Sequence, residues 1–268
     1  MAKRILRASK RTPNEVVLGE LGWRPLRARR RVLRLKFWAK ILRADETRWV
    51  RRVYEESRRQ AEEDPSFLSW AAVTSRILTE VGLGDHWTGQ NTDVQDMSWD
   101  SAVEAAVKAT ETDLWQDRMS SKPILDYYRQ FKDTLVQEEC LKLPDPLDRI
   151  ALTRLRSGTH SLRVHTGRWE RLMEEDGTVR RLTREERTCL HCEGGVDDEE
   201  HFLWACTTHD GIREELFRKL ETHNKPDMLL ALRTPANRRP VHAIKWVMQY
   251  GFAELAWYCR KGFKDRRQ

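Results

Sequence analysis

Apolar positions recur at helical spacing along most of the chain, and the clearest case follows Pro25. Residues three, four and seven apart share one face of a helix. Proline is favoured at the first helical position, so Pro25 fits the start of a long helix. The residues on its expected apolar face are Leu26, Leu33, Phe37 and Ile41.

The same period predicts further helices through the first half. Their expected ranges are 46–62, 66–81, 98–118 and a short one within 123–135. The segment 85–96 is polar and rich in turn-forming residues, so we expect a turn-rich connection there. Alternation with a period of two is nearly absent, which predicts an α-helical bundle with tryptophans in its seams. The expected apolar stripes of the first two helices are Trp49, Val50, Val53 and Tyr54, and Phe67, Trp70, Ala71, Val73, Ile77 and Leu78.

A second part of the chain begins at the Leu-Pro-Asp-Pro run of residues 143–146, the clearest boundary signal. A helix is expected from Asp148 to Gly158. A hairpin is expected around Asp176-Gly177, with strands at 171–173 and 179–182. Later helices are expected at 210–220 and 240–263, before a basic tail that includes Arg267.

Composition fits a folded, soluble protein of 268 residues, 39% hydrophobic and 34% charged. No apolar run approaches the roughly 20 residues of a membrane helix, so we expect no membrane partner. Residues 1–10 are basic without the apolar core of a secretory signal; a transit peptide for organellar import stays open. Cys140 and Cys259 lack obvious partners, which favours a reducing intracellular compartment, nuclear or cytoplasmic.

Positive charge is concentrated at the front of the chain. Residues 1–60 hold 19 Lys and Arg against 6 Asp and Glu, a balance of +13, so the other 208 residues carry −6 of the net +7. Such a block is typical of a polyanion partner, most often nucleic acid, although a solvated helix face is the alternative. The expected phosphate contacts on the first long helix are Arg27, Arg29, Arg30, Arg31, Arg34 and Lys36.

The stretch from Cys189 to Cys206 has the spacing of a zinc site. Cys189 and Cys192 form a CxxC knuckle, and His201 and Cys206 follow across an acidic loop that contains two glycines. Four Cys and His ligands close a tetrahedral structural site, whereas a catalytic zinc usually keeps one position open for water. We therefore predict that Cys189, Cys192, His201 and Cys206 bind structural Zn²⁺.

Two other interpretations of this stretch stay open. His191 and His209 are rival nitrogen donors, and we rank them below His201. Alternatively, the cysteines are buried thiols and His201 is a hydrogen-bonded core histidine.

The predicted fold is mainly α: a helical bundle followed by a small CCHC zinc-knuckle module with one short β-hairpin and a C-terminal helix. The predicted division has four parts. They are a basic arm at 1–13, mobile until bound, an Arg- and Trp-rich helical domain at 14–143, the zinc-knuckle module at 144–223, and a C-terminal helix with a basic tail at 224–268.

Several runs resemble the region downstream of the polymerase in non-LTR (LINE-type) retrotransposon reverse transcriptases. They are residues 18–26, 35–38, 155–160, 166–169 and the knuckle with His201-Phe202-Leu203. The resemblance spans about Val16 to about Leu220, and its most specific part is the knuckle preceded by Thr-Gly-Arg-Trp. It implies helical thumb and connector segments before the knuckle, and a role in gripping template RNA or target DNA. It also implies that Arg163 and Arg168 contact the nucleic-acid backbone.

We find neither catalytic carboxylate motif of that family. A polymerase needs paired aspartates at a β-turn to hold two Mg²⁺, but Asp197-Asp198 lies inside the knuckle loop and lacks the family's aromatic residue. Lys225-Pro226-Asp227 faintly resembles an endonuclease motif, yet the next acidic residue is Glu254, so turn chemistry explains it better. We therefore expect no catalytic residues.

Three functions follow from these observations. The first is a non-catalytic, zinc-containing nucleic-acid-binding protein, with RNA favoured over DNA. The second is a structural subunit or protein-interaction scaffold of a larger ribonucleoprotein, in which zinc only holds the fold. The third is an enzyme fragment that regains activity with a separate polymerase chain.

Overall fold

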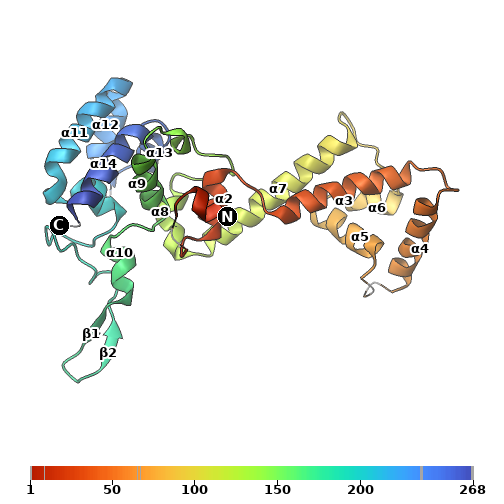
Figure 1. The fold of residues 1–268 in the computed structure, drawn as a ribbon, viewed down its shortest axis with the longest axis horizontal. Helices are drawn as coiled ribbons and strands as arrows, with labels where there is room; N and C mark the ends of the chain where they lie inside the picture. Colours follow the sequence, from red (N-terminus) through yellow and green to blue (C-terminus); the bar gives the residue numbers. More distant parts are fainter. Residues whose placement is uncertain (1, 9, 65, 67, 236–237, 267–268) are drawn as a thin grey trace. The chain divides into compact units, whose positions relative to one another are not determined.

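The computed structural model describes residues 2–8, 10–64, 66, 68–235 and 238–266, and most of them are helical (Figure 1). The chain forms two compact units, here called the inserted unit (Arg24–Asp117) and the terminal unit (Met1–Trp23 with Arg118–Gln268). These borders differ from the sequence-based borders at 13, 143 and 223. Phe67 and Arg267, which we had assigned to a helix stripe and to the basic tail, lie outside the described residues.

The inserted unit is a helical bundle, as the spacing predicts. Trp38 is fully buried, and its indole N–H donates to the hydroxyl of Tyr54 at 2.9 Å. Trp99 is also buried and donates to the backbone carbonyl of Leu35 at 3.2 Å. These two tryptophans therefore lie in the seams, as predicted. The helices are α3 (Leu26–Leu42), α4 (Trp49–Glu63), α5 (Trp70–Glu80), α6 (Gly84–Gly89) and most of α7 (Trp99–Ser120).

The predicted buried face of α3 is wrong in three of its four positions. Leu26, Leu33 and Phe37 are exposed at 74%, 56% and 48%, and only Ile41 is buried. The core side of the helix instead carries Ala28, Leu35, Trp38 and Ala39. Both stripes have helical spacing, so the period alone does not choose between them, and the large indole of Trp38 decides the burial.

Two further corrections concern α4 and α6. On α4 only Tyr54 of the predicted stripe is buried, while Trp49 and Val53 are exposed at 79% and 63%. The segment 85–96, expected to be a turn-rich connection, contains most of α6. This short helix stacks Trp87 on Trp38, with ring centroids 6.3 Å apart and an interplanar angle of 28°. Tertiary packing of one indole therefore outweighs the turn-forming composition.

The terminal unit combines many short helices with one hairpin. Its helix α14 packs against α9 and α11 (Figure 1). Its elements are α1 (Ala2–Ile5), α2 (Asn14–Leu21), η1 (Pro123–Leu125), α8 (Asp126–Arg129), η2 (Glu139–Lys142), α9 (Pro146–Arg156), α10 (Arg163–Thr166), η3 (Gly167–Trp169), β1 (Arg171–Met173), β2 (Val179–Arg181), η4 (His201–Ala205), η5 (Thr207–His209), α11 (Asp210–Leu220), η6 (Glu221–His223), α12 (Pro226–Arg233), α13 (Val241–Gln249) and α14 (Phe252–Asp265).

A buried ion pair ties distant parts of the terminal unit together. The guanidinium of Arg156 lies 2.9 Å from the carboxylate of Glu20 and 2.8 Å from that of Glu138, and both Arg156 and Glu20 are almost fully buried. Gly22 follows Glu20 with a φ of 63°, and an added Cβ would lie 2.3 Å from the backbone nitrogen of Gln137. This corner therefore requires glycine, for its conformation and for the close approach of another chain segment.

The basic arm is partly structured rather than wholly mobile. Residues of the arm form α1, and Leu6 is buried at 5% exposure against Val17 and Leu21 of α2. One apolar residue among the lysines and arginines is enough to anchor the segment.

The hairpin is confirmed, and the C-terminal region needs two corrections. β1 and β2 pair antiparallel with Leu172 opposite Arg180. The expected single helix at 240–263 is two helices, α13 and α14, with the break at Gly251, where an added Cβ would lie 2.5 Å from Leu220. Pro226-Asp227, which we interpreted as a turn, instead opens α12, with Pro226 in its first turn.

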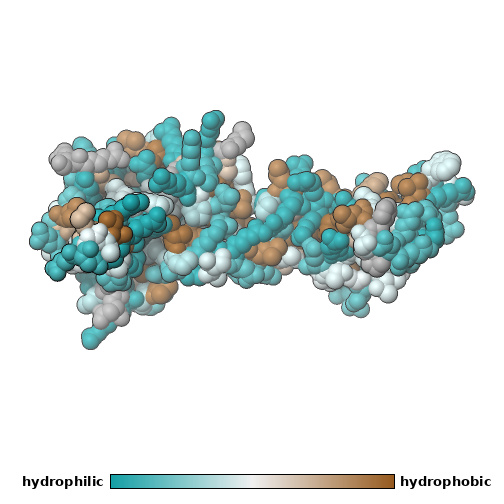
Figure 2. All heavy atoms as spheres, turned by 90° about the horizontal axis from the view of Figure 1, so that it is seen from below, coloured by the Kyte–Doolittle hydropathy of each residue, from teal (hydrophilic) through white to brown (hydrophobic). Residues whose placement is uncertain are grey.

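Hydrophilic side chains cover most of the face drawn in Figure 2, and apolar residues appear on it in small separate groups. A search of the described helices finds none with the length and apolar character needed to span a membrane.

Candidate metal centre and adjoining polar pocket

The predicted zinc ligands come together in the terminal unit. The Sγ atoms of Cys189 and Cys206 are 3.9 Å apart, and Sγ of Cys192 lies 3.1 Å from Nε2 of His201. One ligand atom from each residue lies within 4.8 Å of all the others. A tetrahedral Zn²⁺ with Zn–S bonds of about 2.3 Å requires sulfur–sulfur edges of roughly 3.8 Å. The cluster could therefore bind a metal ion, and its size and donor set are compatible with zinc.

Local backbone structure explains how these four residues converge. In the knuckle, the N–H of Cys189 donates to the carbonyl of Gly195 at 2.8 Å. His201 and Cys206 stand at the start and just past the end of η4, a single π-helical turn, and the N–H of Cys206 donates to the carbonyl of His201 at 2.7 Å. A bond from one residue to the fifth before it brings both side chains to the same side.

A positive charge lies against the thiol pair. The guanidinium of Arg266 is 3.6 Å from Sγ of Cys189 and 3.9 Å from Sγ of Cys206, and it pairs with Asp197 at 2.6 Å. Such outer contacts stabilise thiolates and orient metal ligands. Asp198 contributes similarly, because its Oδ1 accepts the N–H of His201 at 2.9 Å.

Neither rival nitrogen donor joins the cluster. Nε2 of His209 accepts from Nε of Arg266 at 3.1 Å, and burial together with the charge of Arg266 lowers the pKa of His209 to about 4. His209 therefore stays neutral and supports the arginine. His191 is exposed, and its carbonyl accepts from Thr208.

A second cluster, which the sequence reading missed, consists of His160, His165 and Glu199. Nε2 of His160 and Nε2 of His165 lie 3.0 Å and 2.9 Å from the same carboxylate oxygen of Glu199. Burial opposes ionisation of Glu199, but hydrogen bonds from both imidazoles outweigh it and hold its pKa far below the usual value. Burial also lowers the pKa of His165. The basic stretch 159–169 was visible in the sequence, whereas its carboxylate partner lies 34 residues beyond His165.

The outer nitrogens of these imidazoles also have partners. Nδ1 of His160 accepts the backbone N–H of Leu162 at 3.3 Å, and Nδ1 of His165 accepts from Arg168 at 2.9 Å. His160, His165 and Glu199 are residue types that could bind a metal ion. Their hydrogen bonds, however, also form a complete network of two neutral imidazoles and one carboxylate. This network holds Arg168 in place.

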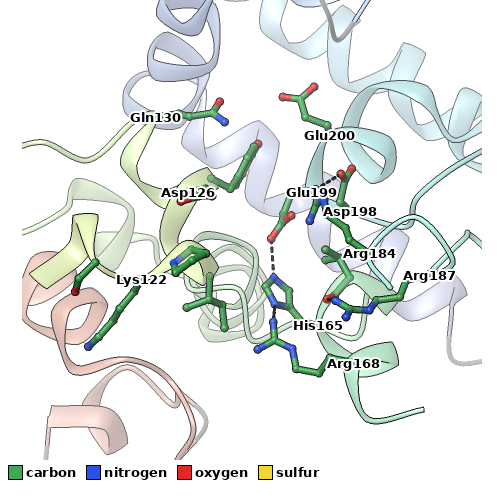
Figure 3. A pocket seen from close by; sticks show the side chains of 15 residues that line it. Lys122, Asp126, Gln130, His165, Arg168, Arg184, Arg187, Asp198, Glu199 and Glu200 are labelled. Carbon is green, nitrogen blue, oxygen red and sulfur yellow. Dashed lines mark hydrogen bonds and ion pairs between the residues drawn. The ribbon is translucent and has the colours of Figure 1, made fainter. Parts of the chain in front are cut away.

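Arg168 borders a pocket of about 700 Å³ (Figure 3). Three of its four carboxylates are matched by cations: Asp126 pairs with Arg129, Asp198 with Arg184 at 2.7 Å, and Glu200 with Arg239. The fourth, Glu199, is held by the two neutral imidazoles. Arg187 also lines the pocket, and its guanidinium donates to the backbone carbonyls of Val164 and Leu182 at 3.0 Å and 2.9 Å.

Most of the predicted nucleic-acid contacts on α3 are paired within the inserted unit. Arg27 pairs with Glu111 at 2.9 Å, Arg31 with Glu80 at 2.5 Å, and Lys36 with Glu104 at 2.6 Å. The guanidinium of Arg34 lies over the ring of Trp70. The exposed residues of the predicted set are Arg29 and Arg30.

Arg29 also lines a groove of about 510 Å³ between α3 and α7. Arg24 and Lys108 line the same groove and are exposed, and Ala28 and Val107 lie in its apolar wall. Among the described residues, none forms an ion pair with Arg24, Arg29 or Lys108.

The two contacts implied by the resemblance have different surroundings. Arg163 is engaged by the fold, because its guanidinium pairs with Glu170 at 2.5 Å and donates to the carbonyl of Thr188 at 2.9 Å. Within the described part of the chain, the guanidinium of Arg168 hydrogen-bonds to His165 alone, and it faces the pocket.

Comparisons of the chain with family models, with curated proteins and with solved structures find no match.

Proposed function

We propose that this chain is a zinc-containing nucleic-acid-binding protein without a catalytic centre, related to the C-terminal part of LINE-type reverse transcriptases. The observation that best supports this proposal is the groove between α3 and α7. Arg24, Arg29 and Lys108 lie beside its apolar wall, and among the described residues no carboxylate pairs with them. Unpaired cations beside an apolar surface suit phosphates and the sugar edges of a nucleic acid. The knuckle residues Cys189, Cys192, His201 and Cys206 would hold structural zinc.

RNA is the favoured ligand in this proposal. Phosphate contacts do not distinguish RNA from DNA, and the resemblance allows both, so the preference rests on exposed indoles such as Trp169, on which unpaired bases of RNA can stack. Free thiols at Cys140 and Cys259 support a reducing intracellular compartment.

The contacts of the acidic residues support the non-catalytic part of the proposal. Asp197 accepts the backbone N–H of Arg163 at 2.9 Å as well as pairing with Arg266. Asp198 pairs with Arg184 and accepts the backbone N–H of His201. Carboxylates engaged in this way are poor candidates for holding catalytic Mg²⁺.

A matched pair of double variants tests the groove. Arg29→Ala/Arg30→Ala removes two exposed arginines of α3. Arg58→Ala/Arg59→Ala removes two neighbouring arginines of α4 that pair with Glu62 and Glu56. Both variants lose two charges in the same unit.

We expect the α3 variant to flatten the slope of log K against log salt by up to about 0.9 per lost contact with duplex DNA, or about 0.7 with a single strand, because fewer counterions are released. The α4 variant should leave the slope near that of the natural chain. Equal slopes for all three proteins would remove α3 as the contact surface.

A protein-interaction scaffold is the second candidate, favoured by the exposed apolar residues Trp49, Val53 and Leu26. Trp49 and Val53 lie one turn apart on α4, and adjoining exposed apolar side chains are typical of a docking surface. Failure to bind any nucleic acid at low salt, with the chain folded and zinc bound, would favour this candidate.

A further inference from the structure

We propose that the pocket of Figure 3 binds a backbone phosphate of single-stranded nucleic acid through Arg168 and Arg187. The inference deepens the proposed function, and it depends on that function for the molecule that carries the phosphate. All of the pocket's residues belong to the terminal unit.

Two positively charged side chains, Arg168 and Arg187, line the pocket. Among the described residues, neither Arg168 nor Arg187 forms an ion pair; their guanidinium groups donate to His165 and to two backbone carbonyls, all of which are uncharged. Burial and the nearby charge of Arg187 lower the pKa of Arg168 below its usual value, and the charge of Glu199 offsets this only in part. Two neighbouring cations without a direct ion-pair partner are stabilised when an anion binds between them.

Residues of the pocket also carry buried hydrogen-bond donors that have no acceptor among the described residues. Nε of Arg168, Nε of Arg187 and the hydroxyl of Tyr127 are buried, and none has a partner within the described structure. All three residues line the same pocket. Buried donors without acceptors are rare in folded proteins, and a bound group rich in acceptor oxygens would satisfy them.

The side chains of Arg168 and Arg187 are held in place by their neighbours. The side chain of Arg187 passes so close to Gly167 that an added Cβ there would lie 3.1 Å from its Cγ. Arg168 is fixed through His165, whose other ring nitrogen is bound to Glu199 (Figure 3). A site with immobilised donors loses little side-chain entropy when it binds its ligand.

The pocket's carboxylates do not make it a cation site. Glu199 is occupied by two imidazoles, Asp198 by Arg184, and Glu200 by Arg239. In Figure 3, Arg168, Arg184 and Arg187 lie toward one end of the pocket, and Gln130 and Glu200 lie toward the other. An anion would therefore bind at the arginine end.

The neighbouring surface favours a nucleic-acid strand as the carrier. A second pocket of about 800 Å³ shares Ile124, His165 and Arg168 with the first, and it is also lined by Trp169. Trp169 is exposed at 57%, and the guanidinium of Arg181 lies 5.2 Å from its ring centroid. An exposed indole beside a phosphate site suits an unpaired base, which can stack on the ring.

The test uses the full-length chain loaded with zinc and a fluorescein-labelled oligouridylate of about 12 nucleotides, within the range that single-strand sites cover. Anisotropy gives the affinity across a salt series. The variants are Arg168→Gln and Tyr127→Phe; the second removes only an unpartnered hydroxyl and should leave the fold intact. Arg218→Gln, an exposed arginine of α11 outside the pocket, is the matched charge control.

We expect Arg168→Gln to weaken binding about tenfold, as for the loss of a charge-assisted hydrogen bond. The slope of log K against log salt should fall by about 0.7, the value for one single-strand phosphate contact. Tyr127→Phe should weaken binding a few-fold without changing the slope, and the control should match the natural chain.

Three results would overturn the inference. Unchanged affinity and slope in Arg168→Gln, with Arg29→Ala/Arg30→Ala still weakened, would remove the pocket and leave the proposed function standing. Weakening by the Arg218→Gln control equal to that by Arg168→Gln would reduce the effect to net charge. Binding of inorganic phosphate that depends on Arg168, with no oligonucleotide binding to the natural chain, would make this a free-anion site and contradict the proposed function too.

Discussion

Replacing Cys192 by serine tests the contribution of the proposed zinc to the fold. Cys192 is only half-buried, so the substitution creates little cavity, whereas Cys189 and Cys206 are fully buried. Its main effect is the loss of one of four ligands. The control is Cys259→Ala, which alters a fully buried thiol outside the cluster.

The expected loss is large compared with the stability of the region. A structural zinc contributes on the order of 10 kcal/mol to folding, whereas a whole domain is stable by about 5 to 15 kcal/mol. The segment around the cluster, from β1 to η5, contains only a two-stranded hairpin and single helical turns, and short elements of this kind are marginal on their own. We therefore expect Cys192→Ser to unfold residues from about 154 to 220.

Hydrogen exchange of the full chain, measured by mass spectrometry, shows which regions lose protection. Peptides from 187–206 should lose protection in Cys192→Ser, and peptides from the inserted unit should exchange as in the natural chain. Cys259→Ala should keep its zinc and its protection around the knuckle. Retained protection of 187–206 in a Cys192→Ser sample that contains no zinc would show that the metal does not hold this segment folded.

Two further predictions concern buried polar groups of the terminal unit. Glu20→Gln should destabilise the chain by about 3 to 5 kcal/mol in urea unfolding, because Arg156 stays buried with less compensation; a loss under about 1 kcal/mol would contradict the assigned role of the pair. Burial lowers the folded-state pKa of His165, so the unfolded chain takes up a proton first and stability should fall as the pH drops below about 6.5. The groups around His165 are His160, Glu199 and Arg168, and a His165→Gln variant should show a weaker decline between pH 7 and pH 5; an identical decline would assign it to other groups.

The sequence predicts local features of this protein better than the pairing of distant ones. The hairpin and the cluster of Cys189, Cys192, His201 and Cys206 follow from spacing, because turn residues and metal ligands act within a few positions. The buried face of α3 did not follow, because two apolar stripes share the helical period and only the partner helices select the one with Trp38. Trp49 was assigned to a core that does not cover it.

Contacts across long stretches of sequence explain the remaining differences. Glu20 and Arg156 are 136 residues apart, and no local pattern pairs them. The network of His165 and Glu199 depends on where the knuckle loop packs, as does the pairing of Asp197 with Arg266. Local sequence patterns do not show which of many charged residues meet, so the arginines left unpaired become visible only in three dimensions.

The proposed function is tested by measuring nucleic-acid binding and the zinc content of the protein in the same sample. Purified full-length protein would be titrated with single-stranded RNA, duplex RNA and duplex DNA across a salt series, and its zinc counted by mass spectrometry. We expect one zinc per chain and binding whose affinity falls steeply with salt. A folded protein with one zinc and no affinity for any of the three at low salt would contradict the proposed function.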